Sequence, residues 1–303
     1  MRILLTGVSG QIGGTLRAPL QTLGNVIGAD RKQIDLSRSA LLSDTLDTMK
    51  PDLIVNPAAY TAVDRAETES ELAFLINATA PGILARWAAK NAVPIVHFST
   101  DYVFDGSGDR PWCEDDVTSP LSVYGRSKLA GENAVRLAGG SHLIIRTSWI
   151  YAASGNNFLQ RIIRRATEGG ELQVVNDQFG APTSITSIAE IFPHIVAGDK
   201  ASIASRFDRL DGIVHIANSG STSWHGFATA ILDGLSKRGI AFAGKIIAPI
   251  SSIDVPTAAK RPRNSRLDLA RLENTLGLKM PDWQTALSDQ LDLVKSPAQS
   301  SVH

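Results

Sequence analysis

The N-terminal stretch constrains the fold more than any other part of the chain. Residues 2–6 form a short apolar run that stops abruptly at Gly7, as a buried parallel strand does. Gly10 and Gly13 continue the turn in a Gly-x-x-Gly-x-x-Gly spacing, and a helical pattern follows as far as Leu23. Backbone N–H groups and the helix dipole at such a turn can hold a pyrophosphate. The stretch therefore predicts a Rossmann-type, doubly wound parallel α/β sheet, although turns also collect glycine for backbone reasons alone.

Further apolar runs extend this pattern through the first half of the chain. Pro81 is expected to kink or restart the helix in which it lies. Several runs end in small or polar residues, and ligands of open α/β sheets bind at the carboxyl ends of the strands. Residues 1–150 are therefore predicted to form a dinucleotide-binding domain. Its further strands are expected at 25–30, 52–56, 94–102 and 142–147, and helices at 69–76, 79–91 and around 124–128.

The second half of the chain has a looser pattern. Residues 151–295 are expected to form mainly a smaller α/β substrate domain interleaved with the first, and 296–303 a flexible tail. Short apolar runs near 172–175 and 212–216 are expected to return as strands to the first sheet. Helices are predicted over 157–167, 184–197, 224–237, 268–276 and 283–295.

Composition excludes several classes of function. The 303 residues include 30 Lys+Arg and 30 Asp+Glu, so no global charge attracts nucleic acid or an anionic membrane. Cys113 is the only cysteine, which excludes an intramolecular disulfide and a multi-cysteine metal site. The first strand begins within two residues of Met1, which leaves no room for a signal peptide, and no apolar run approaches the length of a membrane span. We expect a cytoplasmic protein.

Tyr124 and Lys128 form the pair to which the rest of the chain is expected to bring its ligands. Ser122 or Pro120 can start a helix here, and a spacing of four residues places both side chains on one helix face. A phenol has a reference pKa of about 10, and a neighbouring ammonium should lower it. The pair then predicts a proton donor for general acid–base catalysis. The same spacing also occurs on ordinary solvated helix faces.

The end of the second strand bears on the choice of dinucleotide. Asp30 lies 20 residues beyond Gly10, where an acidic side chain can accept hydrogen bonds from the adenosine ribose and favour NADH. Arg31 and Lys32 follow directly, and either could neutralise the extra phosphate of NADPH. Both cofactors are therefore expected to be accepted. Asp35 and Leu36 could lie near the adenine ring.

Polar residues elsewhere in the strands have competing interpretations. Thr100 ends the fourth strand at the ligand-binding edge and is well placed to bond a substrate oxygen. His97 lies inside an apolar run, which favours a satisfied core histidine. Asn77 could cap a helix break or hold a water, and a structural role is favoured.

Five long runs carry a more specific resemblance. They are residues 56–64 (NPAAYTAVD), 99–104 (STDYVF), 146–151 (RTSWIY), 176–183 (NDQFGAPT) and 261–267 (RPRNSRL). With these residues the chain resembles the extended short-chain dehydrogenases/reductases and, more narrowly, the dTDP-4-dehydrorhamnose reductases. The glycine turn and the Tyr/Lys pair define only the superfamily, whereas the narrower resemblance rests on the five runs and covers nearly the whole chain.

The resemblance implies a role for each matching residue. Tyr124 would be the catalytic acid, and Lys128 would hold the nicotinamide ribose. Thr100 and Asp101 would contact the sugar of a dTDP-sugar substrate, and Trp149 would pack against it. The runs 176–183 and 261–266, with Arg261, Arg263 and Arg266, would line the nucleotide end. The cofactor contacts would come from the glycine turn with Gln11 and Ile12, from Asp30, Asp35 and Leu36, and from Ala59, Tyr60 and Thr61.

One departure from the family pattern and two alternatives accompany these expectations. Some relatives dimerise around a magnesium ion held partly by a glutamate of the first helix, where this chain has Thr15; we expect no metal, and a monomer or homodimer. A non-catalytic regulatory subunit of the same fold is one alternative, but it would not need Tyr124, Lys128 and Thr100 together. A sugar-nucleotide epimerase or another reductase is the other.

Overall fold

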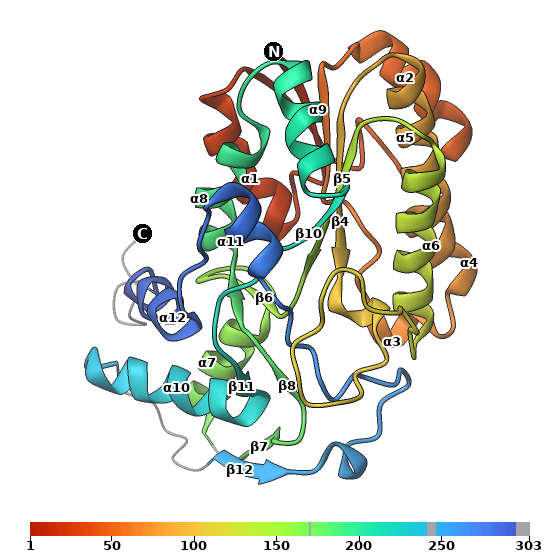
Figure 1. Ribbon diagram of the computed structural model, residues 1–303. Coiled ribbons are helices and arrows are strands. Elements are labelled where there is room, and N and C mark those ends of the chain that lie inside the picture. Colours follow the sequence, from red (N-terminus) through yellow and green to blue (C-terminus); the bar gives the residue numbers. More distant parts are fainter. Residues whose placement is uncertain (170, 241–246, 295–303) are drawn as a thin grey trace.

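A six-stranded parallel sheet forms the centre of the molecule (Figure 1). The computed structural model describes residues 1–169, 171–240 and 247–294, and the predicted tail at 296–303 lies outside these ranges. The strand order is β10-β5-β4-β3-β1-β2, and every pairing is parallel. The strands are β1 (Arg2–Thr6), β2 (Asn25–Ala29), β3 (Leu53–Asn56), β4 (Ile95–Thr100), β5 (His142–Thr147) and β10 (Ile213–His215).

The chain changes direction across this sheet at β1. Leu4 of β1 lies opposite Ile27 of β2 on one side and opposite Ile54 of β3 on the other. Successive strands then continue outward from β3, so the strand order reverses between β1 and β3. Such a switch point leaves a crevice at the carboxyl ends of the two strands, where open α/β sheets bind ligands. The arrangement confirms the predicted Rossmann-type doubly wound sheet.

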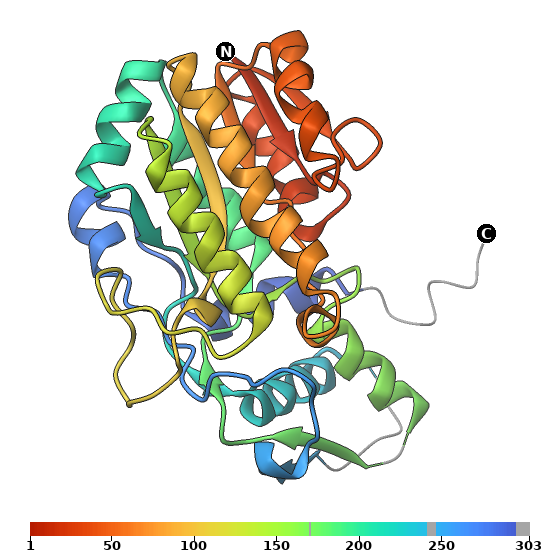
Figure 2. The same ribbon diagram turned by 90° about the vertical axis from the view of Figure 1, so that its right-hand side faces the viewer.

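Helices cover both faces because alternate strand residues point to opposite sides. Ile3 and Leu5 enter one apolar core and Leu4 the other, and all three are fully buried. In Figure 2, α5 and α6 lie side by side over the sheet. One face carries α1 (Gln11–Gln21), α8 (Ile185–Val196), α9 (Lys200–Arg209) and α11 (Ala270–Leu276), and the other α2 (Leu42–Met49), α5 (Ala80–Lys90) and α6 (Val123–Leu137).

The α-helix that contains Pro81 restarts there, as expected, although the helical path is not interrupted. After α3 (Val63–Ala66), α4 (Ser70–Phe74) passes into a π-helical turn, η2 (Leu75–Thr79), and then into α5. Pro81 lies in the first turn of α5, directly after the wider turn. The helical path from Ser70 to Lys90 spans 21 residues and contains an 18-residue window with a mean hydropathy of 1.2, so by length and composition it could cross a membrane. This corrects the expectation that no run approaches that length, but 56% of that window is buried within the protein.

A second core lies beyond the carboxyl ends of the sheet strands. Phe227 and Trp283 are buried there between α7 (Phe158–Glu168), α10 (Trp224–Lys237) and α12 (Trp283–Asp292). The expectation that 172–175 return to the first sheet is wrong, because β7 (Leu172–Val175) pairs with β12 (Ile247–Ile250); the run near 212–216 does return, as β10. The remaining short pairs are β6 (Ile150–Tyr151) with β9 (Thr183–Ser184) and β8 (Phe179–Gly180) with β11 (Thr222–Ser223).

Candidate active site

A cavity of about 770 Å³ opens at the switch point of the sheet. It is lined by the loops that follow β1, β2, β3, β4 and β5 and by one face of α6. The sequence-predicted cofactor and substrate positions converge on this cavity from these six segments. They are Gly7, Gly10, Gln11, Ile12, Gly13, Asp30, Asp35, Leu36, Ala59, Tyr60, Thr61, Thr100, Asp101, Tyr124, Lys128 and Trp149.

The glycine turn brings backbone N–H groups close to the cavity. Gly7 has a positive φ of 61°, and a Cβ atom on Gly13 would lie only 2.3 Å from the carbonyl oxygen of Gly7. Larger side chains at these two positions would therefore distort the turn. Gly10 is the N-cap of α1 and supplies no side-chain cap. The first N–H groups of the helix are left to a ligand or solvent, which suits an anion such as a pyrophosphate.

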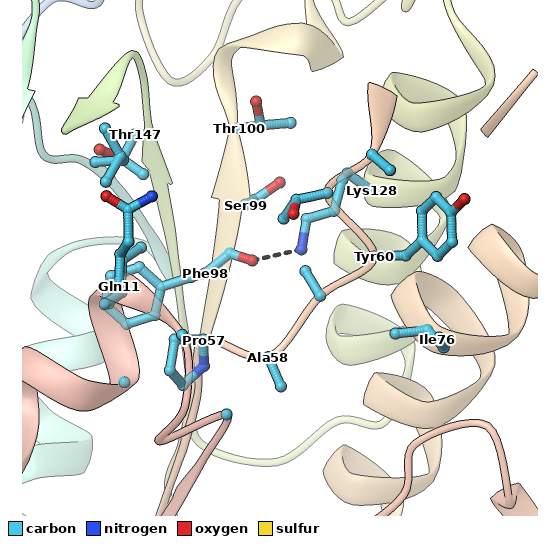
Figure 3. Close-up of a pocket in the computed structure, with 18 of the residues that line it drawn as sticks. Gln11, Pro57, Ala58, Tyr60, Ile76, Phe98, Ser99, Thr100, Lys128 and Thr147 are labelled. Carbon is cyan, nitrogen blue, oxygen red and sulfur yellow. Dashed lines mark hydrogen bonds between the residues drawn. The ribbon is translucent and has the colours of Figure 1, made fainter. Parts of the chain in front are cut away.

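Several buried polar atoms around the cavity lack a partner within the described residues. They come from α1, the end of β4, the end of β5 and the residue after it, and Figure 3 shows two of the side chains, Gln11 and Ser99, on either side of Phe98. Buried polar atoms are normally hydrogen-bonded, so these are free to serve a polar ligand. Nothing in the residue pattern distinguishes the three hydroxyl residues from ordinary strand and loop residues. The atoms are Gln11 Oε1, Ser99 Oγ, Thr147 Oγ1 and Ser148 Oγ.

Charges of both signs border the part of the cavity that follows β2. Asp30 Oδ1 accepts hydrogen bonds from the backbone of Lys32, at 2.7 Å, and of Gln33, at 3.3 Å. Arg31 also lines the cavity and lies 3.6 Å from the carboxylate of Asp35. A hydrogen bond from Ser37 is the main cause that keeps the pKa of Asp35 below its usual range. The two features that favour NADH and NADPH are thus next to each other.

The loop after β3 is held by a buried asparagine. Asn77 Oδ1 accepts from the Tyr60 backbone N–H at 2.8 Å, and Asn77 Nδ2 donates to the Tyr60 carbonyl at 3.0 Å and to Ser127 Oγ at 2.9 Å. The Tyr60 hydroxyl donates to Glu69 at 2.6 Å. Asn77 therefore connects the cavity loop to α6, which confirms a structural role for this residue.

Tyr124 and Lys128 lie one turn apart on α6 and both face the cavity. Ser122 is the N-cap and accepts from the Gly125 N–H at 3.2 Å. The ammonium of Lys128 donates to the Phe98 carbonyl at 2.6 Å, the dashed line in Figure 3. Burial lowers the pKa of Lys128 to about 8, against the opposing charge of Glu132.

The acidity of Tyr124 differs from the sequence-based expectation. Burial raises the pKa of Tyr124 to about 12, and the only lowering influence is a hydrogen bond with Thr100. The predicted lowering by Lys128 is therefore wrong for this arrangement, because burial dominates and the lysine side chain is directed to Phe98. The phenol accordingly keeps its proton throughout the neutral range.

Thr100 and Asp101 form a buried pair at the end of β4. Thr100 Oγ1 donates to Asp101 Oδ1 at 3.0 Å and accepts from the Tyr102 N–H at 3.2 Å. Burial raises the pKa of Asp101 to about 6. The ring of Tyr102 meets that of Tyr124 edge-on, with centroids 5.5 Å apart. The Thr100 hydroxyl thus lies beside the phenol and at the wall of the cavity.

Two tryptophans form the wall on the side of the second core. The Trp149 ring stacks on that of Trp224 with centroids 3.5 Å apart and planes 9° from parallel. Trp149 also has a positive φ of 49°, which is uncommon for a bulky residue and directs its side chain toward α10. Trp224 was not selected from the sequence, since an aromatic residue at a helix start is usual in a core.

The arginines predicted at the nucleotide end lie outside the lining of the cavity. Arg261 is paired with Asp64 of α3 at 2.6 Å, and Arg266 lies 5.9 Å from the centre of the Phe179 ring. Within 176–183, Asp177 accepts hydrogen bonds from Ser251 and Ser252. The Asp177 contacts lie within the second half of the chain, whereas the Arg261–Asp64 pair joins that half to α3. Burial lowers the pKa of Arg161, and the charge of Arg261 adds to this effect, which places two cations near each other.

No group of three or more His, Cys, Asp or Glu side chains suited to a metal ion occurs within the described residues. Helix α1, which contains the expected departure from the family at Thr15, has no acidic residue between Gln11 and Gln21.

Comparison with known proteins gives a consistent result. The family model described as RmlD substrate binding domain matches residues 1–296. A dTDP-4-dehydrorhamnose reductase of Escherichia coli K12 is 42% identical over 298 residues, covering 96% of this chain and 97% of the relative. The crystal structure of a dTDP-4-dehydrorhamnose reductase from Clostridium acetobutylicum has a TM-score of 0.88 at 34% identity and covers 97% of this chain and 99% of that one.

A second solved structure, of the reductase from Bacillus anthracis in complex with NADP, has a TM-score of 0.85 at 32% identity and covers 96% of this chain and 99% of that one. The specific sequence runs, the fold and the cavity described above all agree with this similarity. The chain belongs to the dTDP-4-dehydrorhamnose reductase family.

Proposed function

We propose that this chain reduces the 4-keto group of dTDP-4-dehydro-L-rhamnose to give dTDP-L-rhamnose, with NADPH or NADH as the reductant. The observation that carries the proposal is the position of Tyr124, Lys128 and Thr100 on one cavity with the glycine turn, in a chain of this family. When bound, the reduced nicotinamide supplies the hydride.

The chain's own residues hold the cofactor and the proton. The glycine turn with Gln11 and Ile12 would bind the pyrophosphate, and the unpartnered Gln11, Thr147 and Ser148 atoms fit a large polar ligand. Lys128 would hold the nicotinamide ribose. At the other rim, Asp30 and Arg31 would contact the adenosine ribose or its phosphate.

Tyr124 is the proposed proton donor to the substrate oxygen. Its phenol retains the proton at neutral pH because burial raises its pKa to about 12. Thr100 lies beside it and would share the same substrate oxygen, which requires its hydroxyl to turn from Asp101. Trp149 and Asp101 would contact the sugar ring, while Arg261 and the 176–183 run would lie toward the nucleotide.

The remaining proposals concern the substrate partner, the cellular location, the oligomeric state and the domain boundaries. The substrate partner is a dTDP-sugar, and we propose that the enzyme is cytoplasmic, because its substrate and cofactor are both highly charged small molecules. A monomer or homodimer stays a prediction from the sequence. Residues 1–150 as dinucleotide domain and 151–295 as mainly substrate domain are likewise proposed, with β10 belonging to the first.

The test is oxidation of NADPH and NADH, followed by absorbance, with dTDP-4-keto-6-deoxy sugars offered one at a time. Turnover of the 4-dehydro-L-rhamnose derivative above its epimers is expected. Turnover of another sugar alone would indicate a different sugar-nucleotide reductase or an epimerase. Cofactor binding without turnover of any sugar would instead identify a regulatory subunit of this fold.

A further inference from the structure

A line of four buried polar side chains runs from the glycine turn to Lys128. Thr6 ends β1, Asn56 ends β3, His97 lies in β4, and Lys128 comes from α6. Each of the four is at most 1% exposed. Thr6 Oγ1 lies 2.6 Å from Asn56 Oδ1, Asn56 Nδ2 lies 3.1 Å from His97 Nδ1, and His97 Nε2 lies 3.4 Å from Lys128 Nζ. The proposed reaction uses only the last member of this line.

The contacts of Thr6 set the direction of the first bond. The Ala58 N–H donates to Thr6 Oγ1 at 3.4 Å, which leaves the hydroxyl hydrogen of Thr6 for Asn56. A separation of 2.6 Å is typical of an O–H···O bond and short for N–H···O. The amide oxygen of Asn56 therefore faces Thr6, and its NH₂ group faces His97.

This orientation determines the tautomer of His97. An amide NH₂ group can only donate, so His97 Nδ1 accepts and carries no hydrogen. Burial, with the charge of Lys128 as a second cause, holds the pKa of His97 well below its usual value against the smaller opposing influence of a hydrogen bond with the Asn56 backbone, so the ring is neutral. A neutral imidazole carries one N–H, which must be on Nε2. That hydrogen points toward Lys128.

A donor facing Lys128 Nζ discriminates between the two forms of the lysine. An ammonium has three donors and no acceptor, so it is repelled by an approaching N–H, whereas a neutral amine offers its lone pair. The 3.4 Å separation is longer than a strong hydrogen bond. The bond from Nζ to the Phe98 carbonyl is available to either form. The titratable and charged groups facing this buried region are Tyr124 and Glu132 of α6, His97 of β4, Arg146 of β5, which pairs with Glu132, and Asp101 after β4.

We propose that His97 is a positioning residue, locked by Asn56 and Thr6 as the Nε2–H tautomer, which presents its hydrogen to Lys128 and so makes the ammonium lose its proton at a lower pH than it otherwise would in the cofactor-free enzyme. Thr6 and Asn56 also flank the glycine turn and the loop after β3, so the line joins the cofactor-binding edge to the lysine. The inference deepens the proposed function, because it rests on the role proposed for Lys128.

The first experiment needs no variant. Long-range ¹H–¹⁵N correlation spectra of the cofactor-free protein, labelled at the ring nitrogens of histidine, distinguish the two neutral tautomers and the charged form. We expect His97 to show a protonated Nε2 and an unprotonated Nδ1 at pH 7 and above, with its signals assigned through their loss in His97→Gln. A protonated Nδ1, or a charged ring at pH 7, would overturn the proposal.

The second experiment measures the lysine through dinucleotide binding rather than turnover. NADP⁺ affinity is followed by fluorescence as a function of pH. In the wild type we expect the affinity to be constant up to a break near pH 8 and to weaken above it, because burial lowers the pKa of Lys128 to about 8. His97→Gln can turn an amide oxygen toward the ammonium, which should move the break upward by about one pH unit.

His215→Gln is the matched control. His215 is also a fully buried histidine of the same sheet, but it lies on β10 and does not line the cavity. In His215→Gln, the break in NADP⁺ affinity should stay at the pH found for the wild type. An unmoved break in His97→Gln, or an equal shift in both variants, would contradict the proposal. A wild type with no break at all would show that Lys128 does not hold the dinucleotide, and the tautomer measurement would still decide the state of His97.

Discussion

Substitution of Tyr124 tests the proposed proton transfer most directly. Tyr124→Phe keeps the ring in its edge contact with Tyr102 and removes only the hydroxyl. We expect substrate binding to survive and kcat to fall by about 10²–10⁴-fold, the usual contribution of general acid–base catalysis. Single-turnover hydride transfer measures the step directly. Tyr151→Phe is the matched control, because Tyr151 is fully buried outside the cavity lining. Wild-type hydride transfer in Tyr124→Phe would assign the proton to another group.

Asp30 and Arg31 offer a paired test of cofactor choice. Asp30→Ala removes a carboxylate that repels a ribose phosphate, so the ratio of kcat/KM values should shift toward NADPH. Arg31→Ala removes the neighbouring cation and should shift the ratio toward NADH. The ratio is measured with both cofactors under one set of conditions. If neither variant alters it, these side chains do not touch the adenosine ribose.

The limits of sequence reasoning at this scale have a physical cause. Residue spacing predicted that Tyr124 and Lys128 share a helix face, but spacing does not say where a flexible four-carbon side chain ends. The Phe98 carbonyl that receives Lys128 Nζ is a backbone atom, and every residue has one. Ser99 and Thr147 likewise look like ordinary strand residues until their unpartnered hydroxyls are seen at the cavity.

Helix α6 is positioned by a buried ion pair as well as by packing. Glu132 accepts two hydrogen bonds from Arg146 of β5, at 2.7 and 3.0 Å, and both side chains are at most 3% exposed. Glu132→Gln leaves the guanidinium without its counter-charge in the interior, which should cost about 3–5 kcal/mol of unfolding free energy. Urea unfolding measures the change. Asp292→Asn, at an exposed pair with Arg238, should cost less than about 1 kcal/mol. Equal losses in the two variants would contradict this account.

The segment around Arg261 tests recognition of the nucleotide. Arg261 is already paired with Asp64 and lies near the cation Arg161, so a diphosphate would find two positive charges there. Arg261→Gln should lower kcat/KM for the dTDP-sugar. The loss should correspond to about 1.5–3 kcal/mol of transition-state binding free energy, which is the value of a charge-assisted contact. The nucleotide-free sugar should be a poor substrate of both proteins. Comparable kcat/KM for the free sugar and the dTDP-sugar would exclude this anchor.

Elements were predicted well where their patterns were long and poorly where partners were distant. The apolar runs at β1, β3 and β5 each continue as buried parallel strands, so their type and order followed from the sequence. The run 172–175 could pair with any open edge, and its partner β12 contains Pro249, which argues against a strand. The π-helical turn before Pro81 has no sequence signature, because it depends on how the helix packs against α6.

At the scale of the whole molecule, the two halves of the chain share one sheet. Ile188 and Phe192 of α8, Phe207 of α9 and Leu272 of α11 pack on the same face as Leu16 of α1. The second half therefore completes the core that the first half begins. Interleaving of this kind was expected from the late strand near 212–216, although helix α9 was not.

Two buried histidines in this shared sheet make the stability of the whole molecule depend on pH. Burial lowers the pKa of His215 from an ordinary value of about 6.5 to about 3, so the unfolded chain binds the proton more tightly. The stabilisation is present above pH 6.5 and is lost as pH falls toward 3, at about 1.4 kcal/mol per pH unit below about 6. His97 acts in the same direction, and Asp101, whose pKa burial raises to about 6, in the opposite one.

These other groups are common to the wild type and a His215→Gln variant, so the difference between the two proteins isolates His215. Glutamine does not titrate, and the variant should therefore lose less stability than the wild type as the solution is acidified. Urea unfolding at pH 7, 5.5 and 4.5 gives the free energy of each protein. We expect the wild type to approach or fall below the variant on acidification, by about 1.4 kcal/mol for each pH unit below 6. Parallel curves would mean that His215 binds its proton equally in the folded and unfolded chains.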